Sequence, residues 1–311
     1  MDADTNNLSA SFMRAKKEGA LTRERKQLQV KPNGRSADFI MANFAIGCDL
    51  GCSYCHIARH RPFGNPVELF SNKEEIWDAT YNHWATLPRK IVPNQCDPVY
   101  WTYDIGEGTD CLAPSTFEAT QWFIRRFLED SEAKPSFATK MPLAGRLEAL
   151  AERYRARARV RVSLMPQETA SIVEVGTMGI AQRIKAIDQI LALGYEVHIN
   201  FSPVIAHVGW VNKYIELFAQ LDAGISQNAK NQLKCEVIFL THHPKLHELN
   251  LQWRPEAEEL LWTPEWQERK TNKRGDANVL RYSYTIKSQL VNKFKTLVAQ
   301  HLPYCEIRYI F

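Results

Sequence analysis

The chain has 311 residues, of which 45% are hydrophobic and 24% are charged, a composition that is ordinary for a globular protein. This length allows one large α/β domain with extensions, or two smaller domains. The formal net charge of +4 permits an anionic partner but does not require one, since dedicated nucleic-acid modules are usually more basic. No apolar run approaches the roughly 20 residues that span a bilayer. The polar N-terminal stretch also lacks the apolar segment of a secretory signal, so we expect a cytoplasmic protein with no membrane partner.

Residues 1–37 are polar and mixed in charge, and we interpret them as an N-terminal arm. Six short apolar stretches then follow, and each of the first five precedes a segment with helical spacing. The expected strands are Asp38–Ile46, Pro98–Ile105, Pro135–Lys140, Arg159–Met165, Tyr195–Val204 and Cys235–Leu240. The expected helices are Lys73–Trp84, Thr116–Glu129, Leu143–Arg155, Ile180–Leu193 and Trp210–Leu221.

This alternation predicts an α/β fold with a parallel sheet and right-handed crossovers over residues 38–245. The periodicity alone leaves open whether the sheet is an open doubly wound array or a partial (β/α)6 barrel of the TIM type. We favour the barrel, because the residues that carry chemistry would then gather at the carboxyl ends of the strands. Residues 246–311 form an expected C-terminal extension. It has a basic loop (Arg269, Lys270, Lys273, Arg274), a helix over Thr285–His301 and a final strand that ends at Phe311.

Three of the seven cysteines, Cys48, Cys52 and Cys55, fall within eight residues directly after the first expected strand. Thiolates are the ligands of iron–sulfur clusters, and a compact glycine-containing loop lets three of them converge. Three ligands for the four irons of a [4Fe–4S] cluster leave one iron open. That iron can chelate the amino and carboxylate groups of S-adenosylmethionine, whose cleavage by one electron yields a 5′-deoxyadenosyl radical. The alternative is a structural zinc site with His56 or His60 as fourth ligand, although zinc sites more often show two separated cysteine pairs.

With this loop the chain resembles the radical S-adenosylmethionine superfamily and, within it, the spore photoproduct lyase family. The resemblance runs from about Phe44 to the C-terminus. It is carried by the cysteine loop, Phe137–Lys140, Val160–Ser163, Glu174–Thr177 with Arg183, Ser202–Trp210, Tyr214–Phe218 and Glu306–Phe311. It implies a partial (β/α)6 barrel and a lyase that repairs a thymine dimer lesion, the spore photoproduct, in DNA. It also implies a [4Fe–4S] cluster and S-adenosylmethionine as cofactors, with a reductase, flavodoxin or ferredoxin as electron donor.

The resemblance also implies roles for single residues near S-adenosylmethionine. Lys140 matches the lysine that meets the carboxylate, a task suited to an ammonium point charge. Glu107, after Gly106, resembles the glutamate that binds the amino group. The other positions that the resemblance places near this cofactor are Tyr54, Thr109, Ser163 and Ser202.

The chain departs from the family pattern at two positions, both concerned with returning the hydrogen atom. Glu107 stands where the family has a donor cysteine, and Cys111 lies four residues further on. Cys111 is either the donor, because a thiol S–H bond is weak, or a buried apolar cysteine. His56 replaces a tyrosine that relays a hydrogen atom to the cofactor. The catalytic candidates are therefore Cys111, Glu107 and His56.

Basic side chains provide candidate contacts to a DNA backbone. The substrate-binding candidates are Arg281, Tyr282 and Tyr284, in a region where the family places residues around the lesion. Further phosphate candidates are the basic loop and the run Arg153, Arg155, Arg157, Arg159 and Arg161, which is alternatively a solvated helix face leading into a strand.

Other functions remain as alternatives to the lyase. One is a radical enzyme of the same fold that modifies another nucleic acid or a small molecule, which Glu107 and His56 favour. The others are a non-enzymatic iron–sulfur sensor or electron carrier, and a zinc-stabilised binding module.

Overall fold

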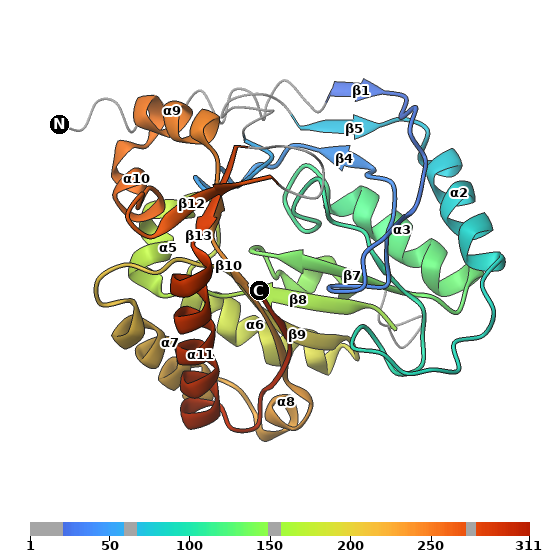
Figure 1. Ribbon diagram of the computed structural model, residues 1–311. Coiled ribbons are helices and arrows are strands. Elements are labelled where there is room, and N and C mark those ends of the chain that lie inside the picture. The colour runs from blue at the N-terminus through green and yellow to red at the C-terminus, as the bar shows by residue number, and fades with distance from the viewer. Residues whose placement is uncertain (1–20, 59–66, 149–156, 272–277) are drawn as a thin grey trace. The chain divides into compact units, whose positions relative to one another are not determined.

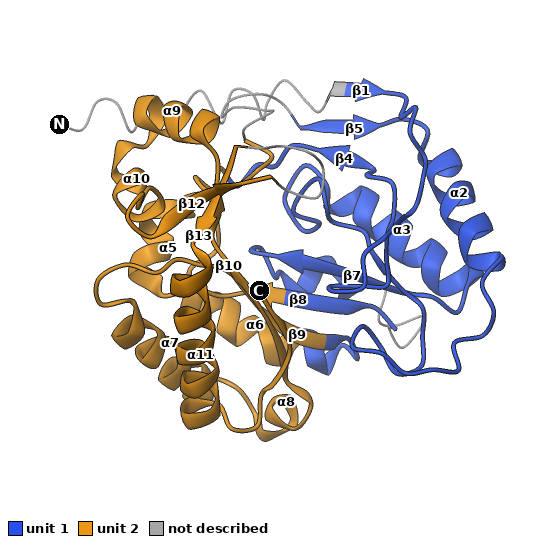
Figure 2. Ribbon diagram, viewed as in Figure 1, with its two compact units in different colours: residues 1–50, 61–161, 190–196 blue, residues 51–60, 162–189, 197–311 orange. Residues whose placement is uncertain are grey.

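The computed structural model describes residues 21–58, 67–148, 157–271 and 278–311. The chain divides into two compact units (Figure 2). Unit 1 comprises residues 1–50, 61–161 and 190–196, and unit 2 comprises residues 51–60, 162–189 and 197–311. Among the described residues, no helix combines the length and the apolar character that crossing a membrane requires.

Unit 1 contains a sheet whose strands run in the order β2 (Lys31–Pro32), β3 (Phe39–Ile40), β6 (Thr102–Asp104), β7 (Lys134–Thr139) and β8 (Arg159–Ser163). The β3–β6 and β6–β7 pairs are parallel, and β2 is antiparallel to β3. A smaller sheet has the order β1 (Leu21–Arg23), β5 (Glu68–Phe70) and β4 (Ala45–Ile46). The helices are α2 (Lys73–Ala85), α3 (Phe117–Asp130) and the 3-10 turn η1 (Ala144–Arg146), and α2 and α3 lie side by side in Figure 1.

The core of unit 1 is aromatic. α3 presents Phe123 and Phe127 four residues apart on one face, as an amphipathic helix does. Phe123 packs on Phe44 with ring centroids 5.1 Å apart, and Phe127 packs on Trp77 of α2 at 4.9 Å and on Tyr103 of β6 at 5.5 Å. These contacts hold the helices and the sheet of unit 1 together.

The sheet continues into unit 2. Its next strands, in the order of hydrogen-bonded neighbours after β8, are β9 (Glu196–Val204), β10 (Lys234–Phe239) and β14 (Glu306–Ile310). Cys235 of β10 pairs in parallel with Ile199 on one side and Ile307 on the other. A small antiparallel sheet has the order β11 (Thr241–His242), β13 (Val279–Tyr282) and β12 (Gln267–Lys270). The helices are α5 (Gln167–Val173), α6 (Ile180–Ala192), α7 (Trp210–Gly224), α8 (Gln227–Gln232), α9 (Pro244–Trp253), α10 (Pro255–Leu261) and α11 (Tyr284–His301).

α7 and α11 lie side by side (Figure 1) and pack on β9 through a second aromatic core. Phe294 of α11 contacts Phe201 of β9 at 5.6 Å, Tyr214 at 5.1 Å and Phe218 at 5.8 Å between ring centroids. The mixed α/β character predicted from the sequence is confirmed, and strands buried along their whole length, such as β8, are typical of a sheet covered on both faces.

Most of the expected elements are present. The structure confirms the helices at α2, α3, α6, α7 and α11 and the strands at β7, β8, β9, β10 and β14. The strand expected over Asp38–Ile46 is wrong as a single element, because β3 pairs with β6 whereas β4 belongs to the other sheet with β5. The strand expected over Pro98–Ile105 is shortened to β6. Its first part turns instead around Asp97, whose Oδ1 accepts hydrogen bonds from the backbone N–H groups of Val99 and Tyr100 at 2.8 Å each.

The helix expected over Leu143–Arg155 begins as the single turn η1, and residues 149–156 lie outside the described residues. β14, in the expected C-terminal extension, continues the sheet of unit 2 beside β10. The boundaries at residues 37 and 245 stay predictions.

Candidate cofactor site

The cysteine stretch begins at a close contact between two loops of unit 1. Gly47, with φ of 106°, donates its N–H to the carbonyl of Gly108 at 3.1 Å. A Cβ atom on Gly108 would lie 2.4 Å from the carbonyl oxygen of Ala45, so only glycine fits there. The Gly106–Asp110 loop is therefore held against the segment that leads into Cys48.

Asp49 anchors the cysteine stretch to the start of α3. Its carboxylate accepts hydrogen bonds from both the N–H (2.7 Å) and the hydroxyl (2.8 Å) of Ser115, and the residue is only 8% exposed. If the Asp49 carboxylate lost these two donors, it would be a buried charge without hydrogen bonds, which is energetically unfavourable. The two hydrogen bonds therefore hold the backbone of Asp49 in place. Cys48, the residue before it, is half-buried and thus accessible to a ligand.

Asp110 ties the same loop to the end of β7. Its carboxylate accepts hydrogen bonds from the hydroxyl of Thr139 and the backbone N–H of Lys140, both at 2.7 Å, and from the N–H of Leu112 at 3.0 Å. Burial raises the pKa of Asp110. The three hydrogen bonds lower it, and so does the positive charge of the nearby Lys140 ammonium. The arrangement brings the Glu107 loop and Lys140 together, as expected from strand ends at one edge of a parallel sheet.

Glu107 and Thr109 are half-buried beside Gly108. The Arg25 guanidinium lies close enough to Glu107 to sense its charge, although burial is the main influence on Arg25 and lowers its pKa. The Thr109 hydroxyl is buried and, within the described part of the chain, has no hydrogen-bond partner. Since buried hydroxyl groups are normally paired, this oxygen is suited to a ligand that the polypeptide does not supply.

Cys111 lies under this loop. Its sulfur would be 2.9 Å from a Cβ atom on Gly106, and the residue is completely buried. Burial raises the pKa of the Cys111 thiol well above its ordinary value, and the carboxylates of Asp110 and Asp104 raise it further. Cys111 is therefore a neutral thiol, the protonation state from which a hydrogen atom could be given.

In unit 2, Cys52 and Cys55 lie on a tight turn. Gly51, directly before Cys52, has a φ of 61°, a left-handed conformation that favours glycine. Within the turn, the N–H of Cys55 donates to the carbonyl of Cys52 at 3.1 Å. Ser53, between the two cysteines, donates its N–H to Val173 at 2.9 Å, and its carbonyl accepts from Asn250 Nδ2 at 2.8 Å. Backbone bonds on both sides thus fix the turn.

A chain of buried hydrogen bonds links this turn to the end of β8. The phenol of Tyr54 donates to Glu174 Oε1, and Glu174 Oε2 accepts from Arg183 Nη2 at 2.7 Å. Arg183 also donates to the carbonyl of Ser163 at 3.0 Å. Burial, together with the charge of Glu174, raises the pKa of Tyr54 well above its ordinary value. Tyr54 thus serves to position the turn between Cys52 and Cys55.

Ser163, at the end of β8, is 1% exposed, and its hydroxyl accepts a hydrogen bond from Asn200 Nδ2 at 3.3 Å. Asn200 Oδ1 is buried without a hydrogen-bond partner among the described residues, although buried polar atoms are normally paired. Ser202 is half-buried on the same strand, and His56 is exposed. Sequence reasoning did not find Asn200.

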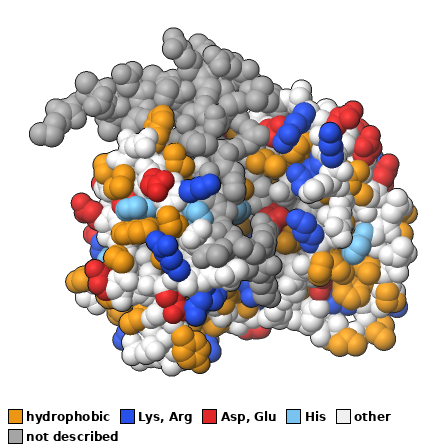
Figure 3. Space-filling view, turned by 45° about the horizontal axis from the view of Figure 1, so that its top comes forward, with side chains coloured by type: hydrophobic (Ala, Val, Ile, Leu, Met, Phe, Trp, Pro, Cys, Tyr) orange, Lys and Arg blue, Asp and Glu red, His pale blue; other side chains and the backbone are white. Residues whose placement is uncertain are grey.

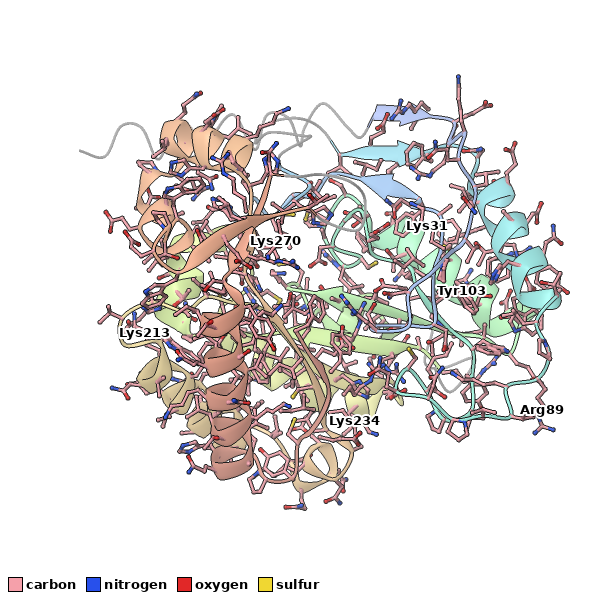
Figure 4. The ribbon with its side chains drawn as sticks, viewed as in Figure 1. Lys31, Arg89, Tyr103, Lys213, Lys234 and Lys270 are labelled. Atoms are coloured by element: carbon pink, nitrogen blue, oxygen red, sulfur yellow. The ribbon has the colours of Figure 1, made fainter. Side chains whose placement is uncertain are left out.

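The three substrate candidates have different environments. Tyr282 is 1% exposed, and its hydroxyl accepts the backbone N–H of Ala206 at 2.8 Å, so its first role is to fix the end of β9. Arg281, also on β13, is half-buried, and Tyr284 at the start of α11 is 82% exposed. Lys270 of the predicted basic loop is exposed at the end of β12 (Figure 4). Lys273 and Arg274 lie outside the described residues.

Of the arginine run, the structure describes Arg157, Arg159 and Arg161. Arg159 and Arg161 are 1% and 4% exposed and make ion pairs with Asp97 (3.0 Å) and Asp104 (2.6 Å). Arg157 donates to two backbone carbonyls. For Arg159 and Arg161 both interpretations, a phosphate contact and a solvated helix face, are wrong, because their guanidinium groups are buried and paired with carboxylates. Arg153 and Arg155 lie outside the described residues.

On the face seen in Figure 3, the Lys and Arg side chains are interspersed with acidic and apolar ones. In this view the basic side chains of the described residues therefore do not gather into one patch.

The donor set fits the expected cofactors. Three thiols within eight residues, each next to a residue with fixed hydrogen bonds, suit an iron–sulfur cluster better than a four-ligand zinc site. Thr109 in unit 1 and Asn200 in unit 2 each have a buried oxygen without a hydrogen-bond partner among the described residues. Asp49, Asp110, Glu174 and Arg183, which hold these groups in place, were not assigned a role from the sequence.

Comparison with known proteins gives consistent results. The model of the spore photoproduct lyase family matches residues 4–311. Spore photoproduct lyase of Bacillus subtilis (strain 168) is 26% identical over 214 residues, which cover 69% of this chain and 59% of that protein. The enzyme of Geobacillus sp. (strain Y412MC61) is 23% identical over 198 residues, covering 63% of this chain and 54% of that protein. The chain thus aligns with less than two thirds of the length of these curated relatives.

Solved structures show the same fold. A double mutant of spore photoproduct lyase with bound AdoMet and dinucleoside spore photoproduct has a TM-score of 0.80 at 18% identity, covering 96% of this chain and 84% of that one. Spore photoproduct lyase complexed with dinucleoside spore photoproduct has a TM-score of 0.79 at 18% identity, with the same coverage.

Proposed function

Because the chain belongs to the spore photoproduct lyase family, we propose that it is a radical S-adenosylmethionine lyase that repairs spore photoproduct, a thymine dimer lesion in DNA. The observation that carries the proposal is the way the cysteine stretch is built. Asp49, Ser53 and Tyr54 each make fixed hydrogen bonds, while Cys48 and Cys55 keep partial exposure. Such a loop is organised around its thiols rather than around a disulfide.

In this proposal Cys48, Cys52 and Cys55 hold a [4Fe–4S] cluster. When bound, the cluster supplies the electron that cleaves S-adenosylmethionine to a 5′-deoxyadenosyl radical. Arg254 lies near Cys52, where its positive charge stabilises a thiolate. The proposed fold around the cluster is the partial (β/α)6 barrel.

We assign the S-adenosylmethionine contacts as follows. Lys140, positioned through its backbone by Asp110, binds the carboxylate. Glu107 binds the amino group, and the Thr109 hydroxyl supplies a hydrogen bond. Tyr54, Ser163 and Ser202 line the adenosine side. A neutral Lys140 variant tests this assignment directly.

The substrate in this proposal is a damaged thymine dinucleotide that is taken out of the base stack. Tyr284 offers an exposed ring for stacking, Arg281 offers a positive charge, and Tyr282 supports both from within the sheet. The electron donor is a reductase, flavodoxin or ferredoxin, and the expected location is the cytoplasm.

Cys111 is the proposed hydrogen-atom donor. It is a neutral thiol on the loop that carries Glu107. His56, which is exposed, and Glu107 stand where the family has its relay tyrosine and donor cysteine, so the return route differs from the family's. This difference favours one second candidate, a radical enzyme of the same fold that acts on another nucleic acid or small molecule.

The experiment is anaerobic reconstitution followed by incubation with dithionite, S-adenosylmethionine and a dinucleotide spore photoproduct. The proposal expects thymidylyl-thymidine to form together with 5′-deoxyadenosine, and the Cys52→Ala variant to form neither. Deoxyadenosine without repaired dinucleotide would contradict the lyase and support the second candidate. Colourless protein with stoichiometric zinc in place of iron would exclude both.

Cys111→Ala tests the donor. We expect deoxyadenosine formation to persist while the ratio of repaired to aberrant product falls. Cys96→Ala, which removes another buried cysteine of unit 1, is the matched control. An unchanged ratio in Cys111→Ala would exclude this cysteine.

A further inference from the structure

Two histidines and a glutamate of unit 2 converge on one point outside the cysteine stretch. His242 ends β11, His247 lies on α9 and Glu258 lies on α10. Glu258 Oε2 is 3.0 Å from His242 Nε2 and 2.5 Å from His247 Nδ1, and one nitrogen or oxygen of each residue lies within 4.8 Å of the others. α9 and α10 are joined at residues 254–255 and lie side by side (Figure 1).

The Glu258 carboxylate has only imidazoles and an amide as polar partners among the described residues. The side chains of His242 and Glu258 are 0% and 4% exposed. Among the described residues, no lysine or arginine pairs with Glu258, and its polar contacts are the two imidazoles and Asn250. A carboxylate out of water requires a positive partner, which is either an imidazolium or a cation.

The surroundings hold the three groups in fixed orientations. Asn250 Nδ2 donates to Glu258 Oε1 at 2.5 Å, which leaves Oε2 turned toward the histidines. The Trp262 ring stacks on His247 with centroids 3.9 Å apart and meets His242 edge-on at 5.9 Å. Metal ligands are typically oriented by outer contacts of this kind.

We propose that His242, His247 and Glu258 bind a divalent transition-metal ion, with zinc as the best match. Two imidazoles and a carboxylate are a donor set for zinc with a fourth position left open. Zinc bonds of about 2.0–2.2 Å place tetrahedral ligand atoms roughly 3.3 Å apart, so Glu258 Oε2 would move slightly away from the two imidazole nitrogens, which now lie at 3.0 and 2.5 Å. The ion would also supply a positive partner for the Glu258 carboxylate. The His247 side chain is 21% exposed, which gives the ion a route from solvent.

The same network reaches the cysteine stretch within unit 2. Asn250 Nδ2, which holds Glu258, also donates to the carbonyl of Ser53 between Cys52 and Cys55. A metal at this site would therefore stiffen the support of the cysteine turn, although its binding does not depend on the proposed lyase activity.

The test separates this site from the cysteines, which also bind zinc. The 311-residue chain carrying Cys48→Ala, Cys52→Ala and Cys55→Ala is stripped with chelator and titrated with zinc. We expect one zinc per chain. Asn250→Ala should weaken binding roughly 10- to 100-fold, as loss of an outer contact does, and His247→Ala should weaken it more. His301→Ala, at the end of α11, is the matched control and should bind zinc normally.

Two further results decide the matter. In the chain that lacks Cys48, Cys52 and Cys55 but keeps all three ligands, cobalt(II) should show the ligand-field bands of a tetrahedral nitrogen–oxygen site without thiolate charge transfer. This measurement needs no substitution at the new site, so the spectrum still tests the proposal if the His247→Ala variant does not fold. Absence of these bands, or zinc affinity unchanged by His247→Ala, would overturn the proposal.

Discussion

The phenol of Tyr54 donates a hydrogen bond to Glu174, which lies 120 residues further along the chain. Glu174 is in turn paired with Arg183, whose guanidinium also binds the carbonyl of Ser163. Through this chain of contacts the residue directly before Cys55 is held by the end of β8. The cysteine turn is thus fixed by distant buried groups as well as by its own backbone.

Glu174→Gln should destabilise the protein strongly. The change leaves the Arg183 guanidinium, which is 0% exposed, without its counter-charge, and breaking a buried ion pair costs about 3–5 kcal/mol. Tyr54→Phe removes only a hydrogen bond to a charged acceptor and should cost about 1.5–3 kcal/mol. Urea unfolding followed by circular dichroism measures both. The control is Glu168→Gln, since Glu168 pairs with Lys213 at the surface and its loss should leave the free energy of unfolding unchanged. Equal stability of Glu174→Gln and Glu168→Gln would refute the argument.

Gly108→Ala should disrupt the support of Cys48. The new methyl group would meet the Ala45 carbonyl at 2.4 Å, and forced overpacking of this kind costs about 1–3 kcal/mol. We expect a lower melting temperature and fewer iron atoms per chain after reconstitution. Gly145→Ala is the matched control, because a Cβ there meets nothing within 4 Å. Iron content that is equal in the two variants would show that the loop contact is unimportant.

The sequence was sufficient for features that are local. The spacing of Cys48, Cys52 and Cys55 is visible in eight residues, and β8 and β9 stand out because apolar residues alternate with polar ones. The Asp38–Ile46 stretch was misjudged because periodicity shows that residues are extended, not which strand they pair with. Its two halves join different sheets.

Features that depend on distant partners were not predictable. Arg161 alternates with apolar residues and was interpreted as a surface charge, because nothing local indicates that Asp104, 57 residues away, neutralises it. The roles of Asp110 and Glu174 were missed for the same reason. The Asp110 carboxylate accepts a hydrogen bond from the hydroxyl of Thr139, which lies 29 residues further along the chain. The His242–His247–Glu258 group was likewise invisible, since its irregular spacing matches no metal-binding motif.

Lys140→Met should raise the KM for S-adenosylmethionine by about tenfold or more, because an ammonium–carboxylate contact worth roughly 1.4 kcal/mol is lost. Lys140 is held by Asp110 through its backbone, so the substitution should leave the loop intact. The measurement is the rate of 5′-deoxyadenosine formation against cofactor concentration with reconstituted protein. Lys185→Met, on the exposed face of α6, is the control. A KM that stays the same in Lys140→Met would remove Lys140 from the cofactor site.

The buried Cys111 thiol should make stability fall in alkaline solution. Burial raises the pKa of Cys111 in the folded chain, whereas the unfolded chain releases the proton near its ordinary pKa of about 8.5. Above that pH the unfolded state holds fewer protons than the folded state, so each further pH unit below the folded pKa costs about 1.4 kcal/mol of stability. The difference in unfolding free energy between the wild type and Cys111→Ala, followed from pH 7 to 10, isolates this group because the other cysteines cancel. Parallel curves would mean that Cys111 ionises normally.

Tyr284, Tyr282 and Arg281 should respond differently to substitution. Tyr284 is 82% exposed, so Tyr284→Ala should leave stability unchanged while weakening the binding of a single-stranded thymine oligonucleotide by about 1–3 kcal/mol through lost stacking. Tyr282→Phe should do the reverse, because its hydroxyl accepts the N–H of Ala206 inside the protein. It should lower stability by roughly 1 kcal/mol and leave the affinity for the oligonucleotide nearly unchanged.

Arg281→Ala should weaken binding and reduce the slope of log affinity against log salt by roughly 0.7, as expected for one phosphate contact on a single strand. Fluorescence anisotropy at several salt concentrations measures these affinities. If Tyr284→Ala and Arg281→Ala bind like the wild type, then the start of α11 and β13 do not contact the nucleic acid.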